Sequence, residues 1–513
     1  MRLRTGTILH PAGAGGNIVR RPTQPRSLQH DAAAISWPMP HSFLLRLLVP
    51  VLVAATPGFA VAQPGLRVAD TITRPFGTLR EQAAEQQRWL ETRMTTVLPA
   101  LMRKHGVDMW IVPMREYNED PVFTSLVSPT TFSARRRTIY VFFDECAARS
   151  RATDPPGCTV QRIALGGTSQ GGVYQAVRST VKASGPAGTR ANETAELWGD
   201  AQWKVLEQVI AARNPRVIAI DRSRTFAFSD GLSSGELDGM RATLGPRWTS
   251  RFRDAESLPL ELIATRIPAE RVFYERLTRL AWTVIDTAFS RAVIAPGVTR
   301  TSDVVWWMRQ RVNDLGLGTW FQPSVEVQRR GATEAQLGDD PVIQRGDVLH
   351  CDFGITALRL NTDTQHMGYV LREGETSVPA GLQRALERSN RLQDIVLAEL
   401  RPGRTGNEVL RASLGRARTE GIDGTIYSHP IGLHGHGAGP LIGLWDYQDG
   451  VPGRGDARVI PDMWFSIELQ ATSPVPEWGG ERVRSAQEED VMLAADGVPR
   501  WAWKRQTEFH LVR

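Results

Sequence analysis

The pattern of apolar positions predicts an α/β domain over residues 80–255. Residues 80–105 are predicted to form an amphipathic helix that ends at Gly106, because seven apolar side chains share one face: Trp89, Leu90, Met94, Val97, Leu98, Leu101 and Met102. Apolar runs at 107–112, 138–143, 160–165 and 217–221 predict strands, and 196–213 predicts another helix. This alternation is typical of helices packed on a sheet. Since no polar spacing here demands chemistry, we interpret it as a structural or oligomerisation domain.

A second pattern begins near residue 262 and occurs twice. A long helical segment (268–291, then 380–400) leads to a Pro-Gly turn and a shorter helix (302–315, then 406–420). A β-rich stretch follows each time, at 323–356 and at 426–470. Thr299 and Thr405 precede the shorter helices and are suited to cap them. The repeated order predicts two related halves about a pseudo-twofold axis, with a site between them.

The first 62 residues have the pattern of a targeting segment. Residues 43–62 are apolar, with Arg46 near their start and Ala60-Val61-Ala62 at their end, which is typical of a secretory signal peptide cleaved before Gln63. Two prolines make this stretch a poor spanning helix. We expect translation to begin at Met39, so that residues 1–38 are not part of the protein. We expect residues 63–79 to be a linker. The mature protein is then periplasmic or secreted, and free of the membrane once the signal is cleaved.

The charge distribution argues against a nucleic-acid partner. The chain has a formal net charge of +6, but its first 62 residues contain six arginines and only one acidic residue, Asp31. The remainder is therefore nearly neutral, whereas nucleic-acid binding needs a clustered basic face.

The cysteines predict one disulfide. Cys146 and Cys158 flank a Pro-Pro-Gly turn between the strands at 138–143 and 160–165, so a hairpin would bring them within bridging distance in an oxidising compartment. Cys351 lies inside an apolar strand and is expected to be a buried thiol. No CxxC or Cys/His zinc pattern is present in the sequence.

The candidate chemistry lies in five short segments after residue 345. Asp352 stands in GDVLHCDFG, Asp363 follows eleven residues later, His429 opens HPIGLHGH, Glu468 ends MWFSIE and Glu488 stands in EEDVML. Carboxylates in apolar strands are costly unless they are paired or bound to a cation. Four carboxylates and one imidazole, without thiolates, suit Mn²⁺, Co²⁺, Fe²⁺ or Zn²⁺ in a bridged pair.

The order and spacing of these five residues resemble the ligand signature of the pita-bread metallopeptidases. This group includes methionine aminopeptidase, Xaa-Pro aminopeptidase, prolidase and the creatinase fold. The resemblance covers about residues 262–495, and residues 80–255 resemble the creatinase-type N-terminal domain. It implies an α/β creatinase-like domain followed by an α+β pita-bread catalytic domain over 262–513, with an internal pseudo-twofold. It further implies two divalent ions, with Mn²⁺ as the first expectation, and a homodimer formed through the N-terminal domain.

The resemblance also assigns roles to the five ligands. Asp352 would bind one metal ion and His429 the other, while Asp363 and Glu488 would bridge both. Glu468 would bind the second ion and also shuttle the proton of the attacking water.

Three further histidines are candidates for contact with the substrate. His436 would polarise the scissile carbonyl or steady the developing oxyanion. His434, in the same loop, is a second substrate-binding candidate. His366 follows Asp363 closely and would replace a contact that the family normally obtains elsewhere.

Several positions depart from the family pattern. After Asp363 the usual Thr-Arg pair is replaced by Thr364-Gln365-His366. The upstream segment that normally presents a substrate-facing histidine reads VEVQR, and no histidine stands four residues before His429. Ala486 occupies the position where Xaa-Pro enzymes often have arginine, with Arg484 as the nearest alternative. The metal ligands are therefore complete, whereas the groups that recognise an Xaa-Pro substrate are not.

Three interpretations remain open. The first is an exported dimetal hydrolase that cleaves a peptide bond, as an Xaa-Pro aminopeptidase or dipeptidase does. The second is a hydrolase of another C–N bond in a small amide or amidino compound. The third is a non-catalytic periplasmic binding protein, against which the retention of all five ligands argues.

Overall fold

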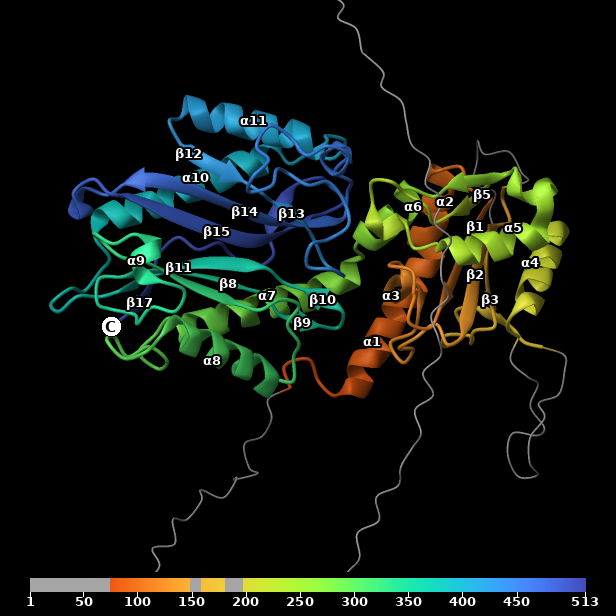
Figure 1. Ribbon diagram of the computed structural model, residues 1–513, viewed down its shortest axis with the longest axis horizontal. Helices are drawn as coiled ribbons and strands as arrows, with labels where there is room; N and C mark the ends of the chain where they lie inside the picture. The colour runs from red at the N-terminus through yellow and green to blue at the C-terminus, as the bar shows by residue number, and fades with distance from the viewer. Residues whose placement is uncertain (1–73, 148–157, 180–196) are drawn as a thin grey trace, which may run out of the picture. The chain divides into compact units, whose positions relative to one another are not determined.

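The computed structural model describes residues 74–147, 158–179 and 197–513 (Figure 1). The predicted signal segment and residues 63–73 of the predicted linker lie outside the described residues. Within the described ranges, no helix combines the length and the apolar character needed to cross a membrane.

The first sheet has six strands in the order β4-β3-β2-β1-β5-β6. The pairs β1–β2 and β2–β3 are antiparallel, whereas β1–β5, β5–β6 and β3–β4 are parallel. The strand bounds are β1 Met109–Arg115, β2 Arg137–Asp144, β3 Val160–Leu165, β4 Gln175–Val177, β5 Ile218–Ile220 and β6 Phe252–Asp254. The strands predicted from the sequence are all present, and their ends differ from the prediction by at most three residues.

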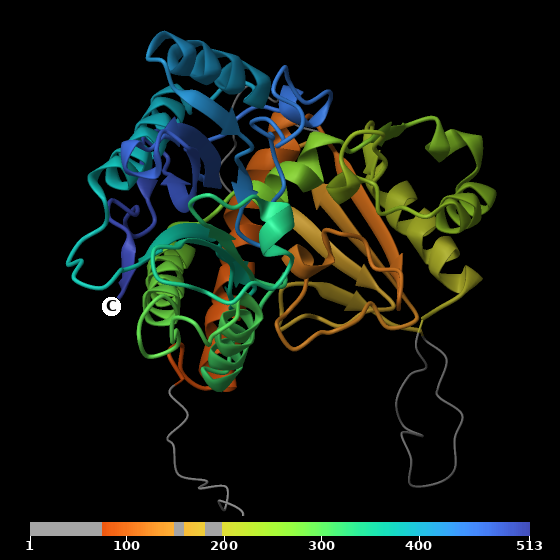
Figure 2. The same ribbon diagram turned by 60° about the vertical axis from the view of Figure 1, so that its left-hand side comes forward.

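Helices cover both faces of this sheet (Figure 2). Met109 and Ile111 of β1 pack with the helices α4 and α5, while Trp110 and Val112 face the opposite way, toward α1 and α2. The predicted helix at 80–105 is present as α1 and α2 joined by one π-helical turn at Arg93–Val97. The helix bounds are α1 Leu79–Thr92, α2 Leu98–Lys104, α3 Phe123–Leu126, α4 Asp200–Arg213, α5 Ser234–Thr249 and α6 Ser257–Ala264.

The second sheet has nine strands and contains the predicted site residues. Its main path is β12-β14-β15-β11-β8-β7, with β13 on β14, β16 on β15 and β17 on β11. A separate two-stranded hairpin joins β9 and β10. The strand bounds are β7 Ser324–Gln328, β8 Val348–Phe353, β9 Thr356–Ala357, β10 Leu360–Asn361, β11 Thr364–Val370, β12 Asp423–Ile426, β13 His429–Ile431, β14 Met463–Pro474, β15 Arg482–Leu493, β16 Pro499–Trp501 and β17 His510–Val512.

Two pairs of helices pack on the two halves of this sheet (Figure 1). Apolar side chains of α7 and α8 form one core with β7 and β8, and those of α10 and α11 form another with β14 and β15. The bounds are α7 Pro268–Ala288, α8 Thr301–Asp314, α9 Glu334–Leu337, α10 Ala380–Glu399 and α11 Gly406–Thr419. The order of two helices followed by strands therefore occurs twice, as the sequence predicts.

The two predicted helix caps differ in outcome. Thr405 caps α11, because its hydroxyl accepts a hydrogen bond from the Glu408 backbone N–H at 3.1 Å. Thr299 does not cap α8, whose N-cap residue is Arg300. The Thr299 hydroxyl instead accepts a hydrogen bond from the Ala295 backbone N–H at 2.9 Å, which closes the preceding turn.

Candidate metal centre

Three of the five predicted ligands lie in one row across the second sheet. Asp352 on β8 is the cross-strand partner of Gln365 on β11, which is in turn the partner of Glu488 on β15. Glu488 is also paired with Glu468 on β14. Directly paired residues point to the same face of a sheet, so the three carboxylates share one face although 136 residues separate Asp352 from Glu488.

The remaining two ligands approach this row from adjacent segments. Asp363 stands immediately before β11, and its backbone N–H points at the buried carboxylate of Asp490, with N···O distances of 3.3 and 3.4 Å. His429 opens β13, which pairs with β14 beside Glu468. The His429 Nδ1 lies 2.9 Å from the Pro430 carbonyl oxygen. This contact fixes a tautomer in which Nδ1–H donates and Nε2 is free to bind a cation.

The five side chains converge closely enough to share cations. His429 Nε2 lies 3.3 Å from Glu488 Oε1, 3.6 Å from Asp363 Oδ2 and 3.8 Å from Glu468 Oε2. Two sets of ligand atoms each lie within 4.8 Å of one another: Asp352, Asp363 and Glu488 form the first, and His429, Glu468 and Glu488 the second. Because Glu488 belongs to both sets, the geometry suits two neighbouring cations with a shared carboxylate.

Unpartnered atoms and charge both indicate a cation at this position. Asp352 Oδ1, Asp363 Oδ1, Glu488 Oε1 and His429 Nε2 are buried and have no hydrogen-bond partner among the described residues. Burial, together with the charge of Glu488, raises the pKa of Asp352, Asp363 and Glu468 well above the usual range. Such a cluster stays ionised only if positive charge is bound among its members. The residues present therefore fit a pair of divalent metal ions.

The structure brings His436 to the metal centre. A ring nitrogen of His436 lies within 4.8 Å of ligand atoms of Asp363 and His429, and its ring centroid is 4.9 Å from that of His429. The preceding residue, Gly435, packs so tightly on the Trp320 indole that an added Cβ would lie 2.3 Å from it. The loop can therefore place His436 over the ligands only with glycine at this position. Burial, followed by the charge of His429, lowers the pKa of His436.

His434 points elsewhere. Its ring packs against Phe228, at a centroid distance of 4.9 Å, and burial lowers its pKa to about 4. It belongs to none of the groups that could hold a metal ion among the described residues.

The interpretation of His366 as a substrate contact is wrong. His366 follows Gln365 on β11, so its side chain projects from the face opposite to the ligands. It is fully buried there, with Nε2 3.1 Å from Glu489 Oε1 and Nδ1 3.0 Å from His510 Nε2. The Trp282 ring packs against it at a centroid distance of 4.1 Å. His366 therefore ties β11 to β15, β17 and α7, and has no access to substrate.

Two side chains at the centre were not singled out from the sequence. The Gln365 amide contacts both Glu468 and Glu488, and the buried carboxyl of Asp490 supports Asp363. Gln365 was detectable, because it stands two residues after Asp363 and so shares its face of the strand. Asp490 carried the same signal, since it stands two residues after Glu488.

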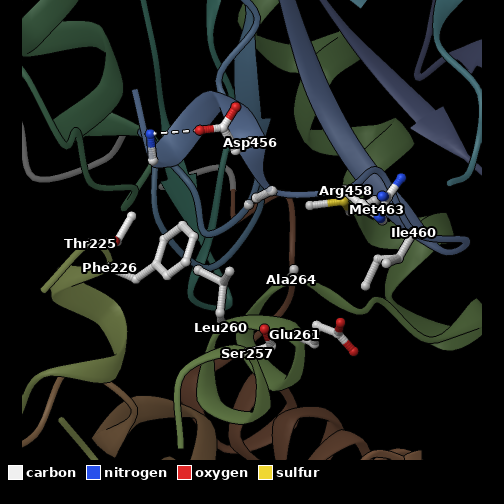
Figure 3. A pocket seen from close by; sticks show the side chains of 13 residues that line it. Thr225, Phe226, Ser257, Leu260, Glu261, Ala264, Asp456, Arg458, Ile460 and Met463 are labelled. Carbon is white, nitrogen blue, oxygen red and sulfur yellow. Dashed lines mark hydrogen bonds between the residues drawn. The ribbon is translucent and has the colours of Figure 1, made fainter. Parts of the chain in front are cut away.

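Two features lie away from this centre. Cys146 and Cys158 form a disulfide between β2 and β3, with a Cα–Cα distance of 5.5 Å, and Cys351 is a buried thiol. A cavity of about 380 Å³ lies between residues 225–226, α6 and the segment 439–463 (Figure 3). None of the predicted site residues lines it. Its acidic groups already have partners: Asp456 accepts from the Gly453 N–H, and Glu261 from Lys104.

Part of the chain matches a known family model. Residues 276–495 match the model of metallopeptidase family M24, a range that contains all five predicted ligands. No curated protein sequence matches the chain.

Solved structures with similar folds cover most of the described chain. A dipeptidase from Pyrococcus horikoshii OT3 is 17% identical with a TM-score of 0.50, covering 82% of this chain and 100% of its own. Zinc-substituted Escherichia coli aminopeptidase P in complex with product is 12% identical with a TM-score of 0.50, covering 82% and 96%. The N-terminal domain of FACT complex subunit SPT16 from chickpea (Cicer arietinum) is 12% identical with a TM-score of 0.52, covering 83% and 99%. These similarities confirm the predicted fold class, a creatinase-like domain followed by a pita-bread domain.

Proposed function

We propose that this chain is an exported dinuclear-metal hydrolase that cleaves a peptide bond in small peptides. The match of residues 276–495 to the model of metallopeptidase family M24 supports this proposal. The substrate class is that of an Xaa-Pro aminopeptidase or dipeptidase. The convergence of Asp352, Asp363, His429, Glu468 and Glu488 on one face of the second sheet carries the proposal.

Each ligand has a role that follows from its position. Asp352, Asp363 and Glu488 would hold one ion, and His429, Glu468 and Glu488 the other. When bound, the pair of ions supplies a Lewis acid for the scissile carbonyl and lowers the pKa of an attacking water.

Two side chains would move or stabilise charge during the reaction. Glu468 uses Oε1 to accept from Gln365, so Oε2 is the oxygen that can take a proton from the attacking water. His436 stands at the open side of the ligand cluster, where a ring N–H can donate to the oxyanion that develops from the substrate carbonyl.

A metal and substrate panel tests this function. Protein purified without chelator is expected to contain about two divalent ions per chain by elemental analysis, with Mn²⁺ expected first and Co²⁺, Zn²⁺ or Fe²⁺ as alternatives. Metal-stripped protein, reloaded with each ion separately, should release the N-terminal residue from peptides with proline in the second position. Absence of bound metal together with absence of turnover after metal addition would contradict the proposal.

One observation favours a second candidate, a hydrolase that acts on the C–N bond of another small amide. Ala486 is buried, and the ligand face beyond Asp352 carries His350 and Glu326, with Glu326 ion-paired to Arg484. The histidine and the arginine of this group stand at positions other than those expected of an Xaa-Pro site, and each contacts Glu326. Turnover of small amides in the same panel, without release from Xaa-Pro peptides, would select this candidate.

The proposal also includes export and assembly. We expect cleavage before Gln63 and a periplasmic or secreted mature protein, which N-terminal sequencing of the protein recovered from each compartment tests. We also expect a homodimer formed through the N-terminal domain, which sedimentation equilibrium tests. A mature protein that still begins upstream of residue 43 would contradict the export proposal.

A further inference from the structure

We propose that Gln365 is a positioning residue for the metal centre, which holds one oxygen of Glu468 and one of Glu488 so that the other oxygen of each faces the cations. This inference rests on the proposed function, because it assumes that the two glutamates bind metal.

Strand pairing places Gln365 directly beside the metal ligands. On β11, Gln365 stands directly opposite Asp352 on one side and Glu488 on the other. Glu488 in turn stands directly opposite Glu468. Side chains at such positions have Cβ atoms about 5 Å apart, which is within the reach of a glutamine amide. Gln365 is only 3% exposed, so the contacts form away from bulk water.

The hydrogen bonds fix which way the amide points. Gln365 Nε2 lies 2.5 Å from Glu468 Oε1 and 3.0 Å from Glu488 Oε2, and Gln365 Oε1 lies 3.0 Å from His350 Nε2. Ionised carboxylates only accept hydrogen bonds, so the amide nitrogen must face the two glutamates. The amide oxygen then accepts from the His350 Nε2–H. His350 is itself buried and lies 3.4 Å from Glu326 through Nδ1.

This arrangement divides the oxygens of each glutamate between two tasks. Glu488 Oε2 accepts from Gln365, while Oε1 has no partner and lies 3.3 Å from His429 Nε2. Glu468 Oε1 accepts from Gln365, while Glu468 Oε2 lies 3.8 Å from His429 Nε2. Glu468 and Glu488 are like charges placed directly opposite each other, an arrangement that is unfavourable unless donors or cations intervene. A neutral amide supplies donors without occupying a cation position.

Metal affinity separates this role from simple packing. Gln365→Met keeps an unbranched side chain of similar length but removes both donors, and Gln365→Thr shortens the side chain beyond reach. Removing a group that orients a ligand typically weakens metal binding 10–100-fold. We therefore expect the dissociation constants of metal-stripped protein for Mn²⁺ and Zn²⁺ to rise by about 10–100-fold in both variants, measured by calorimetry or equilibrium dialysis.

Gln487 offers a matched control. It is buried on the neighbouring strand β15, its Nε2 donates to the Gln506 carbonyl at 3.0 Å, and it faces away from the ligand row. Gln487→Met should lower the thermal midpoint of the metal-stripped protein and leave both dissociation constants within about threefold of wild type.

Three outcomes are decisive. Weaker binding in the Gln365 variants, with wild-type affinity in Gln487→Met, supports the proposal. Wild-type affinity in folded Gln365→Met and Gln365→Thr overturns it while leaving the proposed function intact. Failure of the wild-type protein itself to bind Mn²⁺ or Zn²⁺ overturns the proposed function, and this inference with it.

Discussion

His429→Ala and His436→Ala are expected to separate metal binding from catalysis. His429 provides the only nitrogen among the five ligands, and it is one of three donors in the group with Glu468 and Glu488. Its removal leaves two carboxylates for the second ion. Residues that merely orient a ligand account for up to about 100-fold in metal affinity, so loss of a direct ligand should cost at least that factor, or about 3 kcal/mol. One of the two ions should therefore be lost at micromolar protein concentration.

His436→Ala should instead retain both ions. His436 lies outside the set of Asp352, Asp363 and Glu488 and outside the set of His429, Glu468 and Glu488, so the two cation positions stay complete without it. Its expected contribution is one hydrogen bond to the developing oxyanion. Removal of such a donor typically lowers turnover by about 10²–10³-fold, or about 3–4 kcal/mol of barrier. The loss should fall on kcat rather than KM, because the contact strengthens as charge develops.

The assay combines elemental analysis, metal titration and steady-state kinetics on the same preparations, with circular dichroism as the test of folding. Loss of metal in His436→Ala together with full metal content in His429→Ala would refute the assignment, since the true ligand would then be His436. Unchanged turnover in both variants would refute the catalytic centre itself.

Three further predictions concern stability. Asp120 and Asp221 form a buried carboxyl pair, and burial raises the pKa of Asp120 to about 6 and that of Asp221 well above its usual range. Both exceed the unfolded value of about 3.9, so the contribution of each is complete below about pH 4 and is lost as the pH rises through its folded-state pKa, which is about 6 for Asp120. Asp221→Asn should flatten the fall of the urea midpoint above pH 4 relative to wild type. Reduction of the Cys146–Cys158 disulfide, which closes a loop of sequence separation 12, should lower the unfolding free energy by about 3 kcal/mol, and peptide mapping that finds two free thiols in exported protein would contradict the pairing. His366→Ala should lower the thermal midpoint but leave KM unchanged, whereas a raised KM would restore His366 as a substrate contact.

Much of the fold could be predicted because local patterns agree with tertiary packing. The helix pattern at 380–400 matches α10 (Ala380–Glu399), and the run at 160–165 matches β3. In both cases the apolar positions that define the pattern are those that the core buries, so propensity and burial favour the same structure. The π-helical turn at Arg93–Val97 was not predictable. Arg93 is buried and donates to the backbone carbonyls of Leu262 and Thr265, and these partners are about 170 residues away in the sequence.

The metal ligands could be predicted individually but not as a geometry. Asp352 and Glu468 stand out because each carboxylate interrupts an otherwise apolar strand, which is costly without a partner. Asp363, His429 and Glu488 stand out through their order and spacing relative to these two. The row from Asp352 to Glu468 depends on the strand order β8-β11-β15-β14, which brings β11 between two strands that are distant from each other in sequence. Order and register are tertiary properties, and the sequence pattern does not contain them.

The error at His366 arose because residue type was given more weight than strand parity. Side chains along a strand alternate between two faces, so a residue two positions after Asp363 shares its face and a residue three positions after it does not. This alternation places Gln365 on the ligand face, where its amide contacts Glu468 and Glu488. It places His366 on the opposite face, beside Glu489, although imidazole is the more common catalytic group. A slip of one residue would bring His366 to the ligands, but it would also reverse the two faces of β11. Val370 would then leave the core with α7 and α8, and Met367 and Tyr369 would leave the core that they share with Val348. Burial of these apolar side chains therefore decides which side chain faces the metal centre, and it selects the glutamine.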